Sequence, residues 1–400
     1  MLPIFSKFII QGAYYMAKLT GIAAMVQSTV GKSMKSMTGV SVGFHDPDTW
    51  VSTGSYALNY RISGDFYNGV PLGKVVVFAG DAGAGKSYIV SGNIVRNAQE
   101  QGIYVVVIDT ENALDEAWLA ALGVDTSIEK MAKINMCMID DVAKLYTQII
   151  EGYKQRLASG DDQKLLIVID SLGMLQTPTE VDQVKKGDIK GDMGRKAKQL
   201  KTFVTNAVNG LGACNVGLVA TNHTYASQDM FDPDPKISGG SGFVYAASIL
   251  VAMGLGKLKV DEEGTKTSTV HGIRARCMVR KTRYTKPFEQ VVLDIPYKGG
   301  LNPYSGLFDM FETMNLLTKD GNSYVYVDIE TGERLKFFRK VWEKNTNGCL
   351  DLIMQQFKNN PIVQTHLREA EESANMAEDE MFGMDDEFFD SIEDDPEQPF

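Results

Sequence analysis

Short apolar runs alternate with longer amphipathic stretches through the middle of the chain. Strands are predicted by the apolar runs at 103–109, 134–139, 165–170 and 216–221. Helices are predicted by the stretches at 86–99, 142–157 and 193–211. Strands that alternate with helices in this way are typical of a parallel sheet covered by helices. The pattern therefore predicts an α/β fold with a mostly parallel twisted sheet.

The pattern changes towards the C-terminus. Apolar runs without helices between them predict antiparallel strands added to the sheet, at 248–254, 272–282 and 289–296. From 304 onwards the pattern is mixed, which indicates a small lobe. The expected parts are an N-terminal arm or polymerisation segment (1–50), a core (51–303), a C-terminal lobe (304–368) and an acidic tail (369–400).

Two segments inside the predicted core are too long and too rich in glycine to be simple connections. They lie at 176–192 and 223–242. Long loops without secondary structure are uncommon in compact domains and usually carry function. Both segments are therefore candidate binding loops.

Composition is that of an ordinary globular protein, with 44% hydrophobic and 23% charged residues in 400. The cysteines form no C-x-x-C pair, so neither a zinc site nor a disulfide framework is expected, which fits a reducing cytoplasm. No apolar run reaches the roughly 18 residues of a membrane span, so we expect a soluble protein without a membrane partner. Residues 1–15 are apolar but too short for a signal peptide. A polymerisation arm and an extension upstream of a start at Met16 both explain them.

The net charge of −11 arises in the tail. Residues 369–400 contain 14 acidic residues and no basic one. Because the whole chain has 40 basic and 51 acidic residues, the rest of it carries a net charge of +3. Acidic segments of this kind are usually disordered. We expect a disordered tail that mimics DNA, docks a partner or simply keeps the protein in solution.

The clearest chemical signal is Gly80-Asp81-Ala82-Gly83-Ala84-Gly85-Lys86-Ser87, which matches G-x-x-x-x-G-K-[ST]. It directly follows the apolar run 74–79, as a phosphate loop follows a strand. Glycines let backbone N–H groups point at one anion, Lys86 adds charge at the outer phosphates, and the Ser87 hydroxyl can hold Mg²⁺. The chain is therefore expected to bind a nucleoside triphosphate.

Carboxylates follow two other predicted strands. Asp170 ends an apolar run, where it can order the Mg²⁺ shell opposite Ser87. Asp109 and Glu111 stand at the end of the run at 103–109, at the edge where ligands of open α/β sheets collect. Hydrolysis needs a base that orients or deprotonates water. Glu111 is the candidate base, and Asp109 is the alternative.

Further motifs resemble the RecA recombinases in order and spacing, over about 51–306. They are VSTGS (51–55), GVPLGK (69–74), DTENALD (109–115) and LGVD (122–125). Three others are more similar to the UvsX branch of T-even-like phages than to bacterial RecA: NHTY (222–225), GGSG (239–242) and NPYSGL (302–307). The resemblance implies a RecA-like P-loop ATPase core that hydrolyses ATP with Mg²⁺ when single-stranded DNA is bound.

The resemblance also implies roles for individual residues. Glu111 takes the position of the water-activating glutamate, and Asp115 and Trp118 take those of residues that contact and stack on adenine. Asn222 and His223 take the position that senses the terminal phosphate and relays it to the second DNA loop. Bacterial RecA has Gln where His223 stands, so this chain departs from the family at the relay.

In the resembling family, both long loops contact single-stranded DNA. Cations in and behind the first loop can neutralise phosphates, which makes binding salt-dependent: Lys185, Lys186, Lys190, Arg195 and Lys196, with Lys198 and Lys201 on the helix behind. In the second loop, glycines allow close approach of the backbone and aromatic rings can wedge between bases: Tyr225, Phe231, Gly239 and Gly240.

Lys281 and Arg283 match a basic pair that reaches across a filament interface to the neighbour's triphosphate. The implied protein forms helical filaments on single-stranded DNA and pairs it with duplex DNA in recombination, repair and recombination-dependent replication. It would act in the cytoplasm of an infected bacterium if phage-encoded, with a single-strand binding protein and a loading mediator as candidate partners. Alternatives are a hexameric helicase, disfavoured by the lack of a separate N-terminal helical domain, and a signalling or binding ATPase, disfavoured by the complete catalytic set.

Overall fold

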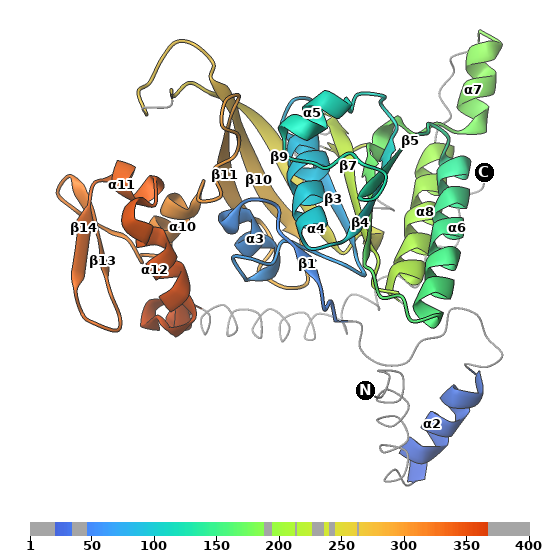
Figure 1. The fold of residues 1–400 in the computed structure, drawn as a ribbon, viewed down its shortest axis with the longest axis horizontal. Coiled ribbons are helices and arrows are strands. Elements are labelled where there is room, and N and C mark those ends of the chain that lie inside the picture. Colours follow the sequence, from blue (N-terminus) through green and yellow to red (C-terminus); the bar gives the residue numbers. More distant parts are fainter. Residues whose placement is uncertain are drawn as a thin grey trace, which may run out of the picture.

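A computed structural model describes residues 21–33, 46–187, 194–212, 214–225, 236–239, 245–261 and 264–366. Its centre is a large sheet with strand order β11-β10-β9-β3-β7-β6-β4-β5, and the short β8 pairs with β7 (Figure 1). The strands are β3 (Val75–Gly80), β4 (Tyr104–Asp109), β5 (Met131–Asn135), β6 (Leu165–Asp170), β7 (Gly217–Tyr225), β8 (Lys236–Ile237), β9 (Ile249–Leu258), β10 (Gly272–Lys281) and β11 (Glu289–Pro296).

Parallel pairing joins the strands from β9 to β5, whereas β10 and β11 are antiparallel additions at one edge. The predicted α/β class, with a mostly parallel sheet and added antiparallel strands, is confirmed. β6 and β11 have the bounds that the sequence predicted.

Both faces of the central parallel strands β3, β4 and β6 are buried, because their side chains alternate between two hydrophobic cores. On β3, Val75 and Val77 face one core, and Val76 and Phe78 face the other. The first face is covered by α6 (Ile139–Ala158) and α8 (Arg195–Gly212), which lie side by side in Figure 1. The second face is covered by α3 (Tyr56–Ser63), by the π-helical η1 (Tyr88–Ile94) that continues as α4 (Val95–Glu100), and by α5 (Glu116–Ala121).

One strand prediction was displaced along the chain. A strand was expected at 134–139, but β5 ends at Asn135 and Ile139 begins α6. Asp140 and Asp141 stand in the first turn of this helix, where carboxylates interact favourably with the helix dipole. The apolar run alone did not reveal this start signal.

The prediction of a structureless loop at 176–192 was wrong for its first half, which forms α7 (Pro178–Lys185). The Thr177 hydroxyl accepts a hydrogen bond from the Glu180 amide (3.1 Å), and the Glu180 carboxylate accepts one from the Thr177 amide (2.7 Å). This capping box is readable in the sequence as T-x-x-E. α7 buries no side chain and projects from the body (Figure 1), while residues 188–193 lie outside the described part.

The second predicted loop is bounded by strands. β7 continues through 223–225 and pairs antiparallel with β8. Residues 226–235 and 240–244 lie outside the described part of the chain. β7 thus ends at Tyr225, four residues beyond the strand predicted at 216–221.

The C-terminal lobe is built on a three-stranded antiparallel sheet. Trp342 is fully buried there and packs edge-to-face on Phe337. Phe66 contacts the rings of Phe311 and Phe357, so the lobe shares a hydrophobic cluster with the core. Its elements are α10 (Leu307–Thr313), β12 (Thr318–Asp320), β13 (Ser323–Val327), β14 (Arg334–Phe337), α11 (Arg339–Glu343), η3 (Thr346–Gly348), α12 (Cys349–Gln356) and η4 (Phe357–Asn359).

The remaining described elements precede the core. α2 (Gly21–Ser33) exposes Ile22 and Met25, and β1 (Trp50–Val51) pairs with β2 (Val70–Pro71). The rest of the predicted N-terminal arm and the acidic tail fall at 1–20, 34–45 and 367–400, outside the described residues. Among the described helices, none is both long and apolar enough to span a membrane.

Candidate nucleotide site

The phosphate loop connects β3 to η1 and requires glycine at its first position. A Cβ atom on Gly80 would lie 2.1 Å from the carbonyl oxygen of Met253 on the neighbouring β9. Gly83 and Gly85 have φ of 76° and 88°, which L side chains rarely adopt. The loop can therefore bring its backbone close to an anion.

Lys86 lies against the loop and is 7% exposed. Its Nζ donates hydrogen bonds to the carbonyl oxygens of Gly80 (3.0 Å) and Asp81 (2.8 Å). Burial lowers the pKa of Lys86 below its ordinary value, and the carboxylates of Asp170, Glu111 and Asp81 oppose that shift. An ammonium group has three N–H donors, so one is left for a phosphate oxygen.

Asp170, at the end of β6, is held by two hydroxyl groups. The Ser91 hydroxyl donates to its Oδ2 (2.7 Å), and the Thr221 hydroxyl donates to its Oδ1. Both oxygens keep lone pairs for a further hydrogen bond. Since Mg²⁺ usually retains several of its waters, Asp170 fits the role of an acceptor for metal-bound water, with the Ser87 hydroxyl as a direct ligand.

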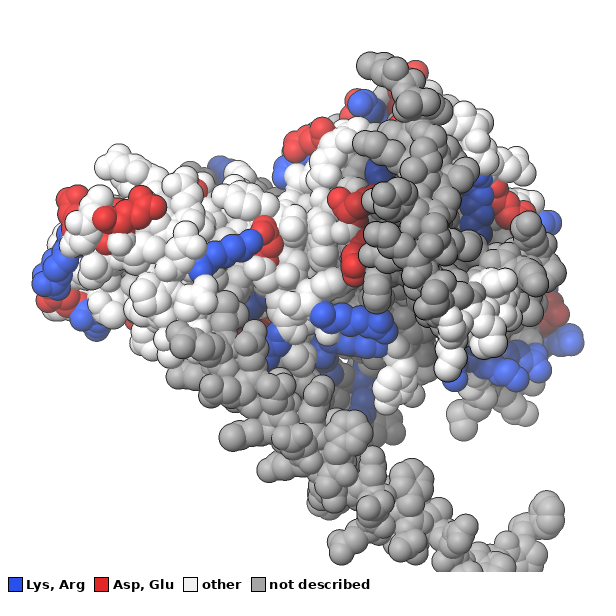
Figure 2. Space-filling view, turned by 90° about the horizontal axis from the view of Figure 1, so that it is seen from below, with Lys and Arg blue, Asp and Glu red and all other residues white. Residues whose placement is uncertain are grey.

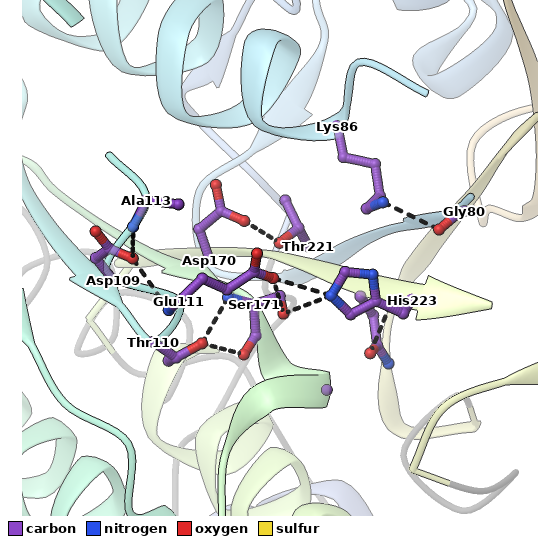
Figure 3. A network of polar contacts seen from close by, with 12 residues as sticks. Gly80, Lys86, Asp109, Thr110, Glu111, Ala113, Asp170, Ser171, Thr221 and His223 are labelled. Carbon is purple, nitrogen blue, oxygen red and sulfur yellow. Dashed lines mark hydrogen bonds and ion pairs between the residues drawn. The ribbon is translucent and has the colours of Figure 1, made fainter. Parts of the chain in front are cut away.

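Glu111 is fixed by Ser171, which directly follows β6, and by His223 of β7 (Figure 3). The Ser171 hydroxyl donates to Glu111 Oε1 (2.7 Å), and His223 Nε2 lies 2.9 Å from the same oxygen. Because a carboxylate only accepts, this contact places the imidazole proton on Nε2. Ser171 Oγ and His223 Nε2 are 3.3 Å apart, so the three groups form a closed network.

Asp109 has a different role from Glu111. Its side chain is 1% exposed and accepts hydrogen bonds from the backbone N–H groups of Glu111 (3.1 Å) and Leu114 (3.1 Å). Lys133 Nζ lies 3.0 Å from its Oδ2. Burial alone would raise the pKa of Asp109, but the N–H donors of Leu114 and Ala113 and the Lys133 ammonium together hold it below its usual range. Asp109 thus shapes the loop that presents Glu111.

One cleft of about 750 Å³ is lined by Lys86, Asp170, Glu111 and His223. Its floor and walls include the following predicted residues: Gly83, Gly85, Lys86, Ser87, Glu111, Trp118, Asp170 and His223. The opposite wall comes from the end of β11 and the segment after it, with Ile295 and Tyr297. Asp115 is exposed at the start of α5 and does not line this cleft, unlike Trp118 on the same helix.

Asn222 is fully buried and connects the cleft to the second loop. Its Oδ1 accepts a hydrogen bond from the His223 amide (2.8 Å), and its Nδ2 donates to the carbonyl oxygen of Ser238 (2.8 Å). Ser238 directly follows β8, on the returning arm of the segment 223–242.

Lys281 and Arg283 stand away from the cleft of their own chain. Lys281 of β10 pairs with Leu250 of β9, and Leu250 pairs with Val77 of β3. The phosphate loop begins three residues further along β3, at Gly80. Three residues of strand separate these levels by about 10 Å. Lys281 Nζ donates to the carbonyl oxygen of Tyr245 (2.6 Å), and burial together with the Arg283 charge lowers its pKa.

The predicted DNA contacts are only partly described. Lys185 and Lys186 end α7, while Lys190, Phe231 and Gly240 lie outside the described residues. Arg195 bonds Thr179, and Lys196 Nζ donates to the carbonyl oxygen of Gly173 (2.8 Å), so both basic residues also tie α8 to the segment before it. Tyr225 is 55% exposed at the end of β7, and Gly239 adopts a φ of 93°.

Sequence reasoning missed the residues that support the site. Ser171, Ser91, Thr221 and Lys133 belong to no motif, and Thr110 stands in DTENALD without a role assigned to it. Their partners are 24 to 79 positions away, beyond the reach of local patterns. Only Ser171 had a signal, because it directly follows the acid that ends an apolar strand.

Comparisons with known proteins agree with this geometry. Residues 27–302 match the family model described as the RecA N-terminal domain. The chain is 25% identical to the "Recombination and repair protein" of Enterobacteria phage T4, over 84% of this chain and 82% of that protein. It is 27% identical to "Protein RecA" of Nocardia farcinica (81% and 86%) and 27% identical to that of Clostridioides difficile (74% and 78%). The resemblance drawn from the motifs is confirmed.

Asp109→Asn tests the support of the Glu111 loop. At pH 7 we expect it to lower the free energy of unfolding by about 1–3 kcal/mol, because buried N–H groups and Lys133 lose a charged acceptor. The contribution of Asp109 is present above its unfolded pKa of roughly 4 and is lost as the pH falls through its lower folded pKa. Urea unfolding should therefore show the difference at pH 7 and a smaller one near pH 3. The exposed Asp162→Asn is the control, and an equal effect of both variants would contradict the assignment.

Proposed function

The chain belongs to the RecA family of recombinases, and from that premise we propose that it hydrolyses ATP when bound to single-stranded DNA, forms helical filaments on that DNA and exchanges strands with a duplex. The observation that carries the proposal is the shared cleft. Lys86, Asp170 and Glu111 line it together, and His223 connects Glu111 to the strand that leads into the second loop.

Glu111 acts as the general base in this proposal. Ser171 and His223 orient its carboxylate, so that a water between it and the outer phosphate is positioned for in-line attack. Lys86 neutralises charge on the outer phosphates, and the loop amides bind the inner ones. Ser87 would hold Mg²⁺ directly and Asp170 would hold it through a metal-bound water, and the ion would supply positive charge at the outer phosphates.

His223 and Asn222 carry the nucleotide state to DNA in this proposal. His223 contacts the carboxylate of Glu111. Asn222 bonds both the His223 amide and the carbonyl of Ser238, which follows the gap at 226–235. A shift of His223 would therefore displace both ends of the segment 223–242: the end that continues β7 and the end that returns through Ser238. Trp118 provides a flat indole surface for the adenine ring.

Lys281 and Arg283 are proposed to act on a neighbour. Because Lys281 lies level with Val77 of β3 and not with the phosphate loop, a second copy has to supply the triphosphate that the basic pair contacts. A repeated head-to-tail interface that does not close builds a helical filament. The helicase alternative is not favoured, because the similar proteins are RecA proteins and a recombination and repair protein.

DNA binding is proposed to use separate groups of cations. The face in Figure 2 carries several distinct clusters of Lys and Arg with acidic residues between them. Lys185, Lys186 and Arg195 stand around the gap at 188–193, and Tyr225 at the start of the second gap. Binding should weaken as salt rises, since each neutralised phosphate releases counterions. A single-strand binding protein and a loading mediator are proposed partners, in the cytoplasm of an infected bacterium.

Lys86→Ala should abolish DNA-stimulated ATP hydrolysis, by at least about 100-fold, because the charge at the outer phosphates is lost. Release of phosphate with and without single-stranded DNA measures this. Lys74→Ala, just outside the loop, is the control. Turnover near that of the parent protein would exclude the phosphate-loop assignment.

Glu111→Gln should slow hydrolysis by about 100- to 10,000-fold, because the base is removed while the shape is retained. Triphosphate binding should persist, so filaments on DNA should last longer in electron micrographs. Glu116→Gln, at an exposed acid of α5 outside the cleft, is the matched control. Normal turnover in Glu111→Gln would remove Glu111 from its role.

Mixing two inactive variants tests action on the neighbour. Lys86→Ala keeps the basic pair, and a double variant, Lys281→Ala with Arg283→Ala, keeps the phosphate loop. In random filaments, about one interface in four joins an intact loop to an intact pair, so hydrolysis should return on mixing. If both variants assemble on DNA but the mixture stays inactive, the basic pair does not act across the interface.

A further inference from the structure

Asp81 lies in the phosphate loop but faces away from the nucleotide cleft. It does not line the 750 Å³ cleft, whereas Ala82 and Gly83 do. Its side chain lines a separate cavity of about 190 Å³ on the other side of the loop, together with Thr224, Met253, Arg276 and Arg280. The G-x-x-x-x-G-K-[ST] pattern leaves this position free. A carboxylate is therefore not required here for phosphate binding.

The Asp81 carboxylate bridges the two strands that flank β3. The Thr224 hydroxyl of β7 donates to its Oδ1 (3.3 Å), and the Leu255 amide of β9 donates to its Oδ2 (3.4 Å). The Asp81 amide also donates to the carbonyl oxygen of Met253 (3.2 Å). One residue thus holds the phosphate loop to both neighbours at the point where β7 leaves the sheet.

The backbone carbonyl of Asp81, in contrast to its side chain, contacts Lys86 of the phosphate loop. Its carbonyl oxygen accepts a hydrogen bond from Lys86 Nζ (2.8 Å) and one from the Ala84 amide (3.2 Å). A phosphate that accepts the third N–H of Lys86 would change the strength of the hydrogen bond to this carbonyl. The peptide and the side chain belong to one residue, so that change reaches Thr224.

Thr224 and His223 are adjacent in β7, so their side chains point to opposite faces of the strand. His223 lines the nucleotide cleft and Thr224 lines the smaller cavity. The next residue, Tyr225, is the last one described before the gap at 226–235. The end of β7 at 223–225, which we call the root of the second loop, is therefore held on both faces of the strand.

We propose that Asp81 and Thr224 form a second link between the phosphate loop and the second DNA loop, on the opposite face of β7 from His223. Asp81 and Thr224 are positioning residues, which act on the geometry of the loop root and not on the reacting atoms. The link rests on the proposed function, because it assumes that nucleotide and DNA bind to one chain. By reciprocity, DNA then tightens nucleotide binding by the factor with which nucleotide tightens DNA binding.

Thr224→Val tests the link, because valine keeps the shape of threonine but cannot donate to Asp81. The measurement is the dissociation constant of a fluorescent, slowly hydrolysed ATP analogue, with and without a saturating oligo-dT strand. The ratio of the two constants is the coupling factor. We expect Thr224→Val to reduce this factor by about 3- to 10-fold, as the loss of one hydrogen bond allows. Thr224→Ser keeps the hydroxyl and should retain the parent factor.

A double-mutant cycle separates the link from a local packing effect. In an Asp81→Ala background, Thr224→Val should have no further effect on the coupling factor, because the hydroxyl has lost its acceptor. Asp81→Asn should retain the factor, since its amide can donate to Thr224 and its oxygen can accept from Leu255.

The possible outcomes distinguish a failure of the Asp81–Thr224 link from a failure of the proposed function. If the parent protein couples DNA and nucleotide but Thr224→Val has the same factor, the link is wrong and the proposed function stands. An equal effect of Thr224→Val in both backgrounds also overturns the link. If the parent shows no coupling, the proposed function and the link both fail.

Discussion

The register of β3 between β7 and β9 is the constraint on which the rest of the site depends. Gly80 pairs with His223 on one side and with Met253 on the other. The first residue of the phosphate loop is therefore beside His223, the first residue after the buried part of the strand that leads into the second loop. A shift of one residue would reverse every side chain of β3 between the two cores, so the apolar packing fixes this register.

Parallel pairing then brings the reactive groups to one edge. Asp109 pairs with Asp170 across β4 and β6, and β6 pairs in turn with β7. The carboxyl ends of these strands meet at the same level, which places Glu111, Ser171 and His223 within hydrogen-bonding distance although they are 52 to 112 positions apart. The chemistry of the cleft is thus a consequence of strand order, and Asp170, Glu111 and His223 each bond a side chain from another strand or from the residue that follows one.

The sequence predicted those parts of the structure that local patterns determine. The phosphate loop, the acid at the end of β6 and the candidate base were found because each follows a buried apolar run. The shift of β5 and the helix α7 do not follow from apolar runs and glycines, because their signals are polar residues at helix starts: Asp140 and the Thr177 capping box. The support of Asp109 by Lys133, and the bond between Asp81 and Thr224, depend on strand order and could not be found in the sequence.

The central claim is that one chain binds triphosphate and single-stranded DNA in a coupled way. The most direct test is the affinity of the full chain for a fluorescent single-stranded oligonucleotide, measured by anisotropy with a slowly hydrolysed ATP analogue and again with ADP. The account predicts tighter binding with the triphosphate, by about fivefold or more. Equal affinities in the two nucleotide states would contradict it.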